Sequence, residues 1–133
     1  TLAGIPAIAL SQQGGRENRD EYQVAEAHGA TLIQHLWDYG WSERIIPNLN
    51  FPKGDPDAIK GMKVASTDQH KFGDIIDEGA EAGFFRLGPL ITNPDASPKS
   101  DRAAIRDGWV SMTPLGMDLT AHHQISEFEP LTF

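Results

Sequence analysis

A continuous apolar segment, Ile5–Leu10, is the feature that most restricts how this chain can fold. The segment shows no alternation between apolar and polar residues, so both of its faces should be buried. Strands inside a parallel sheet have this pattern, because helices cover both faces of such a sheet. Pro6 is expected near the start of the strand, where a missing backbone donor is tolerated. The segment therefore predicts an α/β fold with a buried strand over residues 5–10.

A long helix is expected to follow, from about Asn18 to Tyr39. Gly40 is the expected terminator, and a strand ended by Pro52 is predicted over residues 45–51. A strand, a helix and a strand in this order predict a crossover between neighbouring parallel strands. Residues at spacings of three and four form the predicted core face of the helix: Tyr22, Ala25, Gly29, Leu32, Ile33 and Leu36.

The second half of the chain predicts strands, turns and one short helix. Strands are expected over residues 62–66, 83–87 and 109–113, the last of them stopped by Pro114. Either Ser100 or Asp101 is expected to cap a helix that ends at Arg106. Four aromatic residues are expected in the core: Phe51, Phe84, Phe85 and Trp109.

The expected fold class is α/β, with all of residues 1–133 in one domain. Residues 1–60 should form a sheet edge and the helix crossover. Residues 61–117 should form a β extension rich in hairpins, and residues 118–133 a C-terminal arm.

Charge and composition exclude several classes of function. The chain has 11 Lys and Arg against 19 Asp and Glu, a formal net charge of −8. A nucleic-acid surface is not expected, because such a surface needs a basic stripe. The absence of cysteine excludes disulfides and thiolate metal sites. The apolar segments are short and no secretory signal follows Thr1, so we expect no membrane span and a cytoplasmic location.

Ser11 is the residue with the clearest signal for ligand binding. It directly follows the first predicted strand, and ligands of open α/β sheets bind beyond the carboxyl ends of their strands. A capping or turn-forming serine is the alternative interpretation.

The signals for metal binding are weaker. Carboxylates suit Mg²⁺, but acidic turns are common in a chain of this charge. His28 and His35 share a helix face, and the adjacent pair His122 and His123 has no third ligand. We therefore predict no catalytic and no metal-binding residue in this chain. The carboxylates in predicted loops are Asp55, Asp57, Asp74, Asp77 and Glu78.

Three segments resemble the SurE survival-protein family, and they occur in the family's order. Gly4–Ser11 is similar to the strand beyond the family's glycine-rich phosphate region. Asn48–Pro52 is similar to its Asn-x-Asn-x-Pro strand. Gly108–Leu115, continuing to Asp118–His122, is similar to its signature Gly-aromatic-Val-Ser-x-Thr-Pro-Leu, followed by Asp-Leu-Thr. Pro47 departs from the pattern, since the family usually has an apolar strand residue there.

The resemblance implies the carboxyl-terminal portion of a Rossmann-like domain in a metal-dependent phosphate-monoester hydrolase. The implied substrates are nucleoside 5′- or 3′-monophosphates, and the implied metal is Mg²⁺ or Mn²⁺. The family's metal ligands are an aspartate pair, a serine and an asparagine, all before the first matching strand. This sequence has no Asp-Asp pair and no Ser-Gly-Thr phosphate segment. The chain alone is therefore expected to be inactive, and a non-catalytic oligomerisation or interaction module is the alternative.

The resemblance also implies a homodimer or homotetramer whose subunits exchange C-terminal elements. The arm begins around Asp118 and His122, which are four residues apart. Asp118 could accept a hydrogen bond from the backbone or from His122 and so fix the direction of the arm at a subunit interface or hinge. The alternative is that both are ordinary surface residues. Four apolar residues further along should pack on another subunit: Ile125, Phe128, Leu131 and Phe133.

Overall fold

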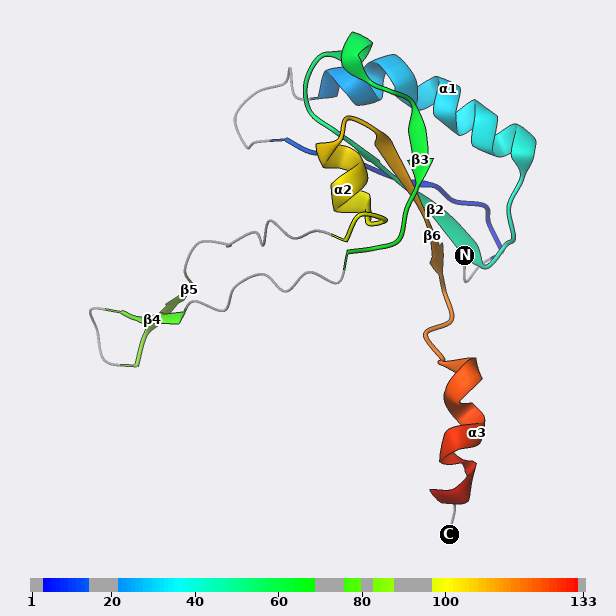
Figure 1. Ribbon diagram of the computed structural model, residues 1–133, viewed down its shortest axis with the longest axis vertical. Coiled ribbons are helices and arrows are strands. Elements are labelled where there is room, and N and C mark those ends of the chain that lie inside the picture. Colours follow the sequence, from blue (N-terminus) through cyan, green and yellow to red (C-terminus); the bar gives the residue numbers. More distant parts are fainter. Residues whose placement is uncertain (1–3, 15–21, 69–75, 80–82, 88–96, 132–133) are drawn as a thin grey trace.

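The computed structural model describes residues 4–14, 22–68, 76–79, 83–87 and 97–131 (Figure 1). Its main body is a four-stranded mixed sheet with the strand order β1-β2-β6-β3. Strand β1 is parallel to β2, β2 is antiparallel to β6, and β3 is parallel to β6. The predicted α/β class and the parallel strand–helix–strand unit are therefore confirmed. The four strands are β1 (Ala9–Gln12), β2 (Ile45–Phe51), β3 (Met62–Val64) and β6 (Val110–Gly116).

Two helices accompany the sheet, and the remaining elements are short. Helix α1 (Gln23–Tyr39) connects β1 to β2, and α2 (Asp101–Arg106) precedes β6. Strands β4 (Ile76–Glu78) and β5 (Phe85–Leu87) form a separate antiparallel pair, which extends to one side in Figure 1. The short helical segments are η2 (Pro56–Ala58), η3 (His122–Gln124), α3 (Ile125–Phe128) and η4 (Glu129–Leu131).

The hydrophobic core lies between α1 and one face of the sheet. Leu49 and Phe51 alternate with polar residues along β2, so both point to the same face. There they meet Val110 of β6 and two residues of α1, Val24 and Leu36. This cluster holds α1 on the sheet and sets the position of the strand ends.

Helix α1 differs from its prediction at its first turn. Residues 15–21 lie outside the described part of the chain, and α1 begins at Gln23. Tyr22 is the residue before the helix and is exposed, whereas Val24 is fully buried. The predicted core role of Tyr22 is wrong, because a residue outside the helix does not follow its periodicity. The end is as predicted, with Gly40 at a φ of 75° and its N–H bonded to the Leu36 carbonyl.

The first strand is a correction to the sequence analysis. It covers Ala9–Gln12 instead of residues 5–10, and Leu10 at its centre is 46% exposed. The continuous apolar run predicted burial on both faces. In the structure β1 is the edge of the sheet, with β2 as its one pairing partner among the described residues. Leu10 lies opposite Leu49 on the α1 face and is only partly covered there. Pro6 lies before the strand, as its missing N–H requires.

Two prolines face each other on the two inner strands of the sheet. Pro47 of β2 is paired in register with Pro114 of β6. Val110 donates to the Gly61 carbonyl and the Met112 carbonyl accepts from Ala65, so alternate residues of β6 turn their backbone groups toward the β3 side. Pro114 continues this alternation, and β3 has already separated at that point. The prediction that Pro114 stops the strand is wrong, because its missing N–H faces a side on which no described strand is paired with it.

After β3, the structure confirms the predicted cap of the short helix but not the predicted burial of two phenylalanines. Ser100 is the cap of α2, since its hydroxyl accepts from the Ala103 N–H at 3.2 Å. Phe84 and Phe85 are exposed instead of buried, because they belong to the β4–β5 hairpin, away from the four-stranded sheet. Of the four described strands in residues 61–117, β3 and β6 belong to the main sheet, and β4 and β5 form the separate pair. The division into three regions stays a prediction.

Candidate functional site

The strand register places four polar residues in one row across the sheet. Ser11 of β1 lies opposite Asn50 of β2, Asn50 lies opposite Ser111 of β6, and Ser111 lies opposite Lys63 of β3. Because strand side chains alternate, this row belongs to the face opposite Leu49 and Phe51. The sheet therefore has an apolar face against α1 and a polar face on its other side.

Ser11 forms a direct contact with its neighbour in this row. Its hydroxyl donates a hydrogen bond to the side-chain carbonyl oxygen of Asn50. One residue later, the Gln12 side-chain carbonyl accepts from the Ala25 N–H at 2.9 Å, which ties the end of β1 to the first turn of α1. Ser11 is exposed and lies toward the carboxyl ends of two parallel strands, where α/β sheets bind ligands. Its role as a ligand contact stays a prediction.

Two hydroxyls on the polar face are buried without a hydrogen-bond partner in the structure. They belong to Ser111, which is fully buried, and Thr113, which is 4% exposed. A buried polar group without a partner costs about 1–3 kcal/mol. Sequence reasoning missed both residues, as it missed Asn50. The signal was present, since alternation along Val110–Thr113 and in the Asn-x-Asn segment places these polar side chains on one face.

A network of short contacts joins the start of α2 to the segment after β3. The Asp101 N–H donates to the Ser66 carbonyl at 2.8 Å. The Asp101 carboxylate accepts from the backbone N–H groups of Asp68 and Arg102, and the side chains of Asp68 and Arg102 form an ion pair at 3.7 Å. These contacts hold together the two ends of the connection between β3 and β6.

The predicted contact between Asp118 and His122 is present. The Asp118 carboxylate lies 2.7 Å from His122 Nε2 and accepts from the Thr120 N–H at 2.8 Å. The hydrogen bond from His122, followed by those from Thr120, lowers the pKa of Asp118 to about 2. Both side chains are solvent-accessible. The hydrogen bond spans the turn between β6 and the terminal helical segments. That the pair fixes the direction of the arm at a subunit interface or hinge stays a prediction.

We predict that the Asp118 carboxyl titrates near pH 2 instead of its ordinary value of 3.8. Since the pKa is lowered in the folded state, the ionised carboxylate stabilises the turn above about pH 3.8. This stabilisation is lost as the pH falls from there through about 2. The measurement is an NMR titration of the side-chain carboxyl carbon.

The two histidines provide a matched pair for this titration. His122→Ala should raise the midpoint toward 3.8, because it removes the largest cause of the shift. His123→Ala should leave it unchanged, since the groups that lower this pKa are His122, Thr120 and Arg44, and His123 is not one of them. A midpoint that does not move in His122→Ala would contradict the assignment.

Two other candidate ligands, His28 and Asp55, make local structural contacts, and three more lie wholly or partly outside the described part of the chain. His28 Nε2 lies 2.9 Å from the Pro56 carbonyl oxygen and joins α1 to η2. Asp55 accepts from the Asp57 N–H in a turn. Asp74 and the side chains of Asp77 and Glu78 are not described. Within residues 4–14, 22–68, 76–79, 83–87 and 97–131, no group of three or more His, Cys, Asp or Glu side chains could hold a metal ion. No helix in these ranges is long and apolar enough to cross a membrane.

Comparison with known protein families shows which family this chain belongs to. The family model described as "Survival protein SurE" matches residues 1–74, which is more than half of the 133 residues. The chain belongs to the SurE family. The resemblance found in the sequence is therefore confirmed.

Curated SurE relatives match nearly the whole chain. The 5′-nucleotidase SurE of Brucella abortus strain S19 is 40% identical over 128 residues, 92% of this chain and 50% of that protein. The 5′-nucleotidase SurE of Brucella canis is 39% identical over the same coverage. The chain thus spans about half the length of the curated relatives it matches.

A solved SurE structure has the same fold. The SurE protein from Aquifex aeolicus superposes with a TM-score of 0.84 at 23% identity, covering 98% of this chain and 53% of that protein. The Rossmann-like SurE fold expected from the sequence is confirmed by this match.

Proposed function

We propose that this chain is the carboxyl-terminal portion of a metal-dependent phosphate-monoester hydrolase that acts on nucleoside 5′- or 3′-monophosphates. The observation that carries the proposal is the 40% identity to a 5′-nucleotidase SurE over 92% of the chain. The proposal assigns Ser11 to substrate binding, supported by its exposed hydroxyl beside Asn50 at the end of two parallel strands.

The described side chains do not fit the divalent metal that the family implies. No suitable group of three ligands exists among them, and the acidic pair of the family's motif does not occur in the sequence. We therefore derive no catalytic step through Mg²⁺ or Mn²⁺ from this chain. In the proposal, the ligands belong to the half of the relatives that the chain does not match.

We predict that the 133-residue chain by itself has no appreciable phosphatase activity. Purified chain should hydrolyse neither a nucleoside monophosphate nor p-nitrophenyl phosphate above background, with either Mg²⁺ or Mn²⁺ added. The physical reason is that nothing described in the chain can polarise the phosphoryl oxygens and activate water as a bound metal does. Metal-dependent turnover that co-purifies with the chain and disappears when one of its carboxylates is mutated would contradict the prediction.

The alternative function is a non-catalytic module for oligomerisation or interaction. The observation that favours it is the terminal segment, in which Ile125, Phe128 and Leu131 are all exposed. Both proposals expect a homodimer or homotetramer, no broad nucleic-acid surface because of the net charge of −8, and a cytoplasmic location. Cell fractionation tests the location.

The intact protein, isolated from its source with an antibody against this chain, distinguishes the two functions. A mass well above that of 133 residues, together with metal-dependent release of phosphate from nucleoside monophosphates, would support the hydrolase. A mass equal to that of the chain, with no hydrolysis, would support the module and overturn the hydrolase.

A further inference from the structure

An elongated groove runs along the free edge of β6, where β3 has separated from it. Its volume is about 790 Å³, within the range of small-molecule sites. The groove exists because β3 follows β6 only as far as Ala65, and then turns to meet Ser100 through the bridge at Ser66. Pro114 lines the exposed edge and offers no N–H to a pairing strand. An extended peptide is therefore poorly matched to this edge, whereas a small molecule needs no strand pairing.

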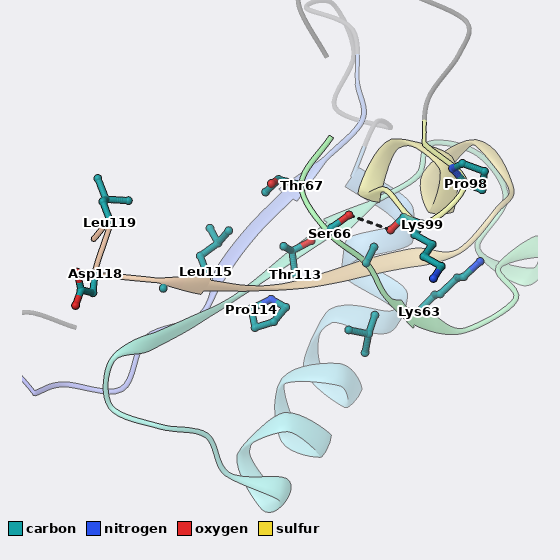
Figure 2. Close-up of a pocket in the computed structure, with 13 residues that line it drawn as sticks. Lys63, Ser66, Thr67, Pro98, Lys99, Thr113, Pro114, Leu115, Asp118 and Leu119 are labelled. Atoms are coloured by element: carbon teal, nitrogen blue, oxygen red, sulfur yellow. Dashed lines mark hydrogen bonds between the residues drawn. The ribbon is translucent and has the colours of Figure 1, made fainter. Parts of the chain in front are cut away.

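The groove contains a polar atom that lacks a partner. Thr113 lines it and is 4% exposed, and its hydroxyl has no hydrogen bond in the structure. Figure 2 shows the Thr113 side chain close to the segment that carries Ser66 and Thr67. The Ser66 hydroxyl is already engaged with the Lys99 carbonyl at 3.4 Å. Thr113 is thus a buried donor and acceptor without a partner at the wall of the groove.

Charge is distributed unevenly along the groove. In Figure 2 the side chains of Lys63 and Lys99 extend toward the same end, far from Leu119. The carboxylate of Asp118 lies toward the opposite end, and its pKa of about 2 keeps it ionised at neutral pH. Two ammonium groups at one end of a groove are notable in a chain with a net charge of −8. The rest of the lining is largely apolar, with Val64, Pro98 and Leu115 among its residues.

We propose that this groove binds a small organic anion with an apolar body. The anionic group lies between Lys63 and Lys99, the apolar body lies along Val64 and Leu115, and the Thr113 hydroxyl hydrogen-bonds to the ligand. Asp118 excludes a second negative charge at the far end, so the ligand carries a single anionic group. The site is separate from Ser11 and from the proposed phosphate-ester chemistry, and it does not depend on that proposal.

The test uses 4-phenylbutyrate as the probe and the 133-residue chain as the protein. Binding is followed through the methyl NMR signals of Thr113, Val64 and Leu115 during titration. The matched neutral probe is 4-phenylbutan-1-ol, and inorganic phosphate tests whether an anion alone is sufficient. The acid should shift the signals of all three methyl groups saturably. The alcohol should bind at least about fivefold more weakly than the acid. Phosphate should leave the methyl signals unchanged.

Three variants separate the contributions. Lys63→Gln combined with Lys99→Gln should weaken binding of the acid about fivefold and leave the alcohol unaffected. Lys53→Gln, an exposed lysine outside the groove, is the charge control and should change neither. Thr113→Val should weaken binding about three- to tenfold. It should leave the Tm of the free chain unchanged or higher, because it removes a hydroxyl without a partner.

The proposal is overturned by any of three results. The first is equal affinity for the acid and the alcohol, which would make the groove merely apolar. The second is a response to phosphate equal to that to the acid, which would reduce the site to a surface anion contact. The third is unchanged affinity in both the lysine variant and Thr113→Val.

Discussion

Replacing Phe51 with alanine should remove a large part of the folding free energy of this chain. Phe51 is fully buried at the end of β2 and belongs to the cluster that joins the sheet to α1. Truncating a buried phenylalanine costs about 3–5 kcal/mol, whereas an ordinary domain has a stability of only about 5–15 kcal/mol. In urea denaturation followed by circular dichroism, the midpoint should fall to a low urea concentration or the variant should be unfolded in buffer.

Phe84 provides the matched control for this substitution. It is 67% exposed and lies beside β5, outside the core cluster. Phe84→Ala should therefore change the free energy of unfolding by no more than about 0.5 kcal/mol. Equal losses in the two variants would show that burial in this cluster is not the main source of stability.

Deleting residues 121–133 should lower the mass measured by light scattering toward that of a single chain. The deleted segment carries Ile125, Phe128 and Leu131, which are exposed in the single chain. Its helix α3 extends away from the sheet in Figure 1. Burying each of these side chains is worth about 1.5–3 kcal/mol, so a partner subunit that covers them gains several kcal/mol. We expect the unmodified chain to be a dimer or larger under the same conditions.

A variant of full length tests whether the apolar side chains themselves cause the association. Ile125→Ser combined with Phe128→Ser keeps the segment but removes most of its apolar surface, and it should reproduce the shift in mass. His123→Ala, an exposed residue of the same segment, should leave the mass unchanged. An oligomeric mass that survives both the deletion and the double substitution would remove the segment from the interface.

The local elements of the fold could be predicted well from the sequence. Gly40 ends α1, Ser100 caps α2, and the apolar alternation of Leu49 and Phe51 identifies a core strand. Each of these rests on interactions between residues close in sequence, where spacing and backbone preference decide the outcome.

What could not be predicted depends on position in the tertiary structure. The run from Ile5 to Leu10 predicts a buried strand, but whether that strand lies inside the sheet or at its edge depends on neighbours that a strand pattern does not specify. The extension of β6 through Pro114 depends on which side of the strand is unpaired. The contact of Ser11 with Asn50 joins residues 39 apart in sequence and follows from the register of two strands. In contrast, Asp118 and His122 are neighbours along the chain, so their hydrogen bond could be foreseen.

The opposed prolines of β2 and β6 restrict how this sheet can grow. Pairing of β1 with β2 begins at Asn48, directly after Pro47, and pairing of β3 with β6 ends at Met112, two residues before Pro114. Within the described part of the chain, the sheet is thus two strands wide at the row of Pro47 and Pro114, and neither strand offers an N–H there to an incoming third. Unintended edge-to-edge association, the route by which exposed strands aggregate, is blocked at this end. Edge-to-edge association remains possible along the outer edges of β1 and β3, so aggregation of the chain should begin at those edges.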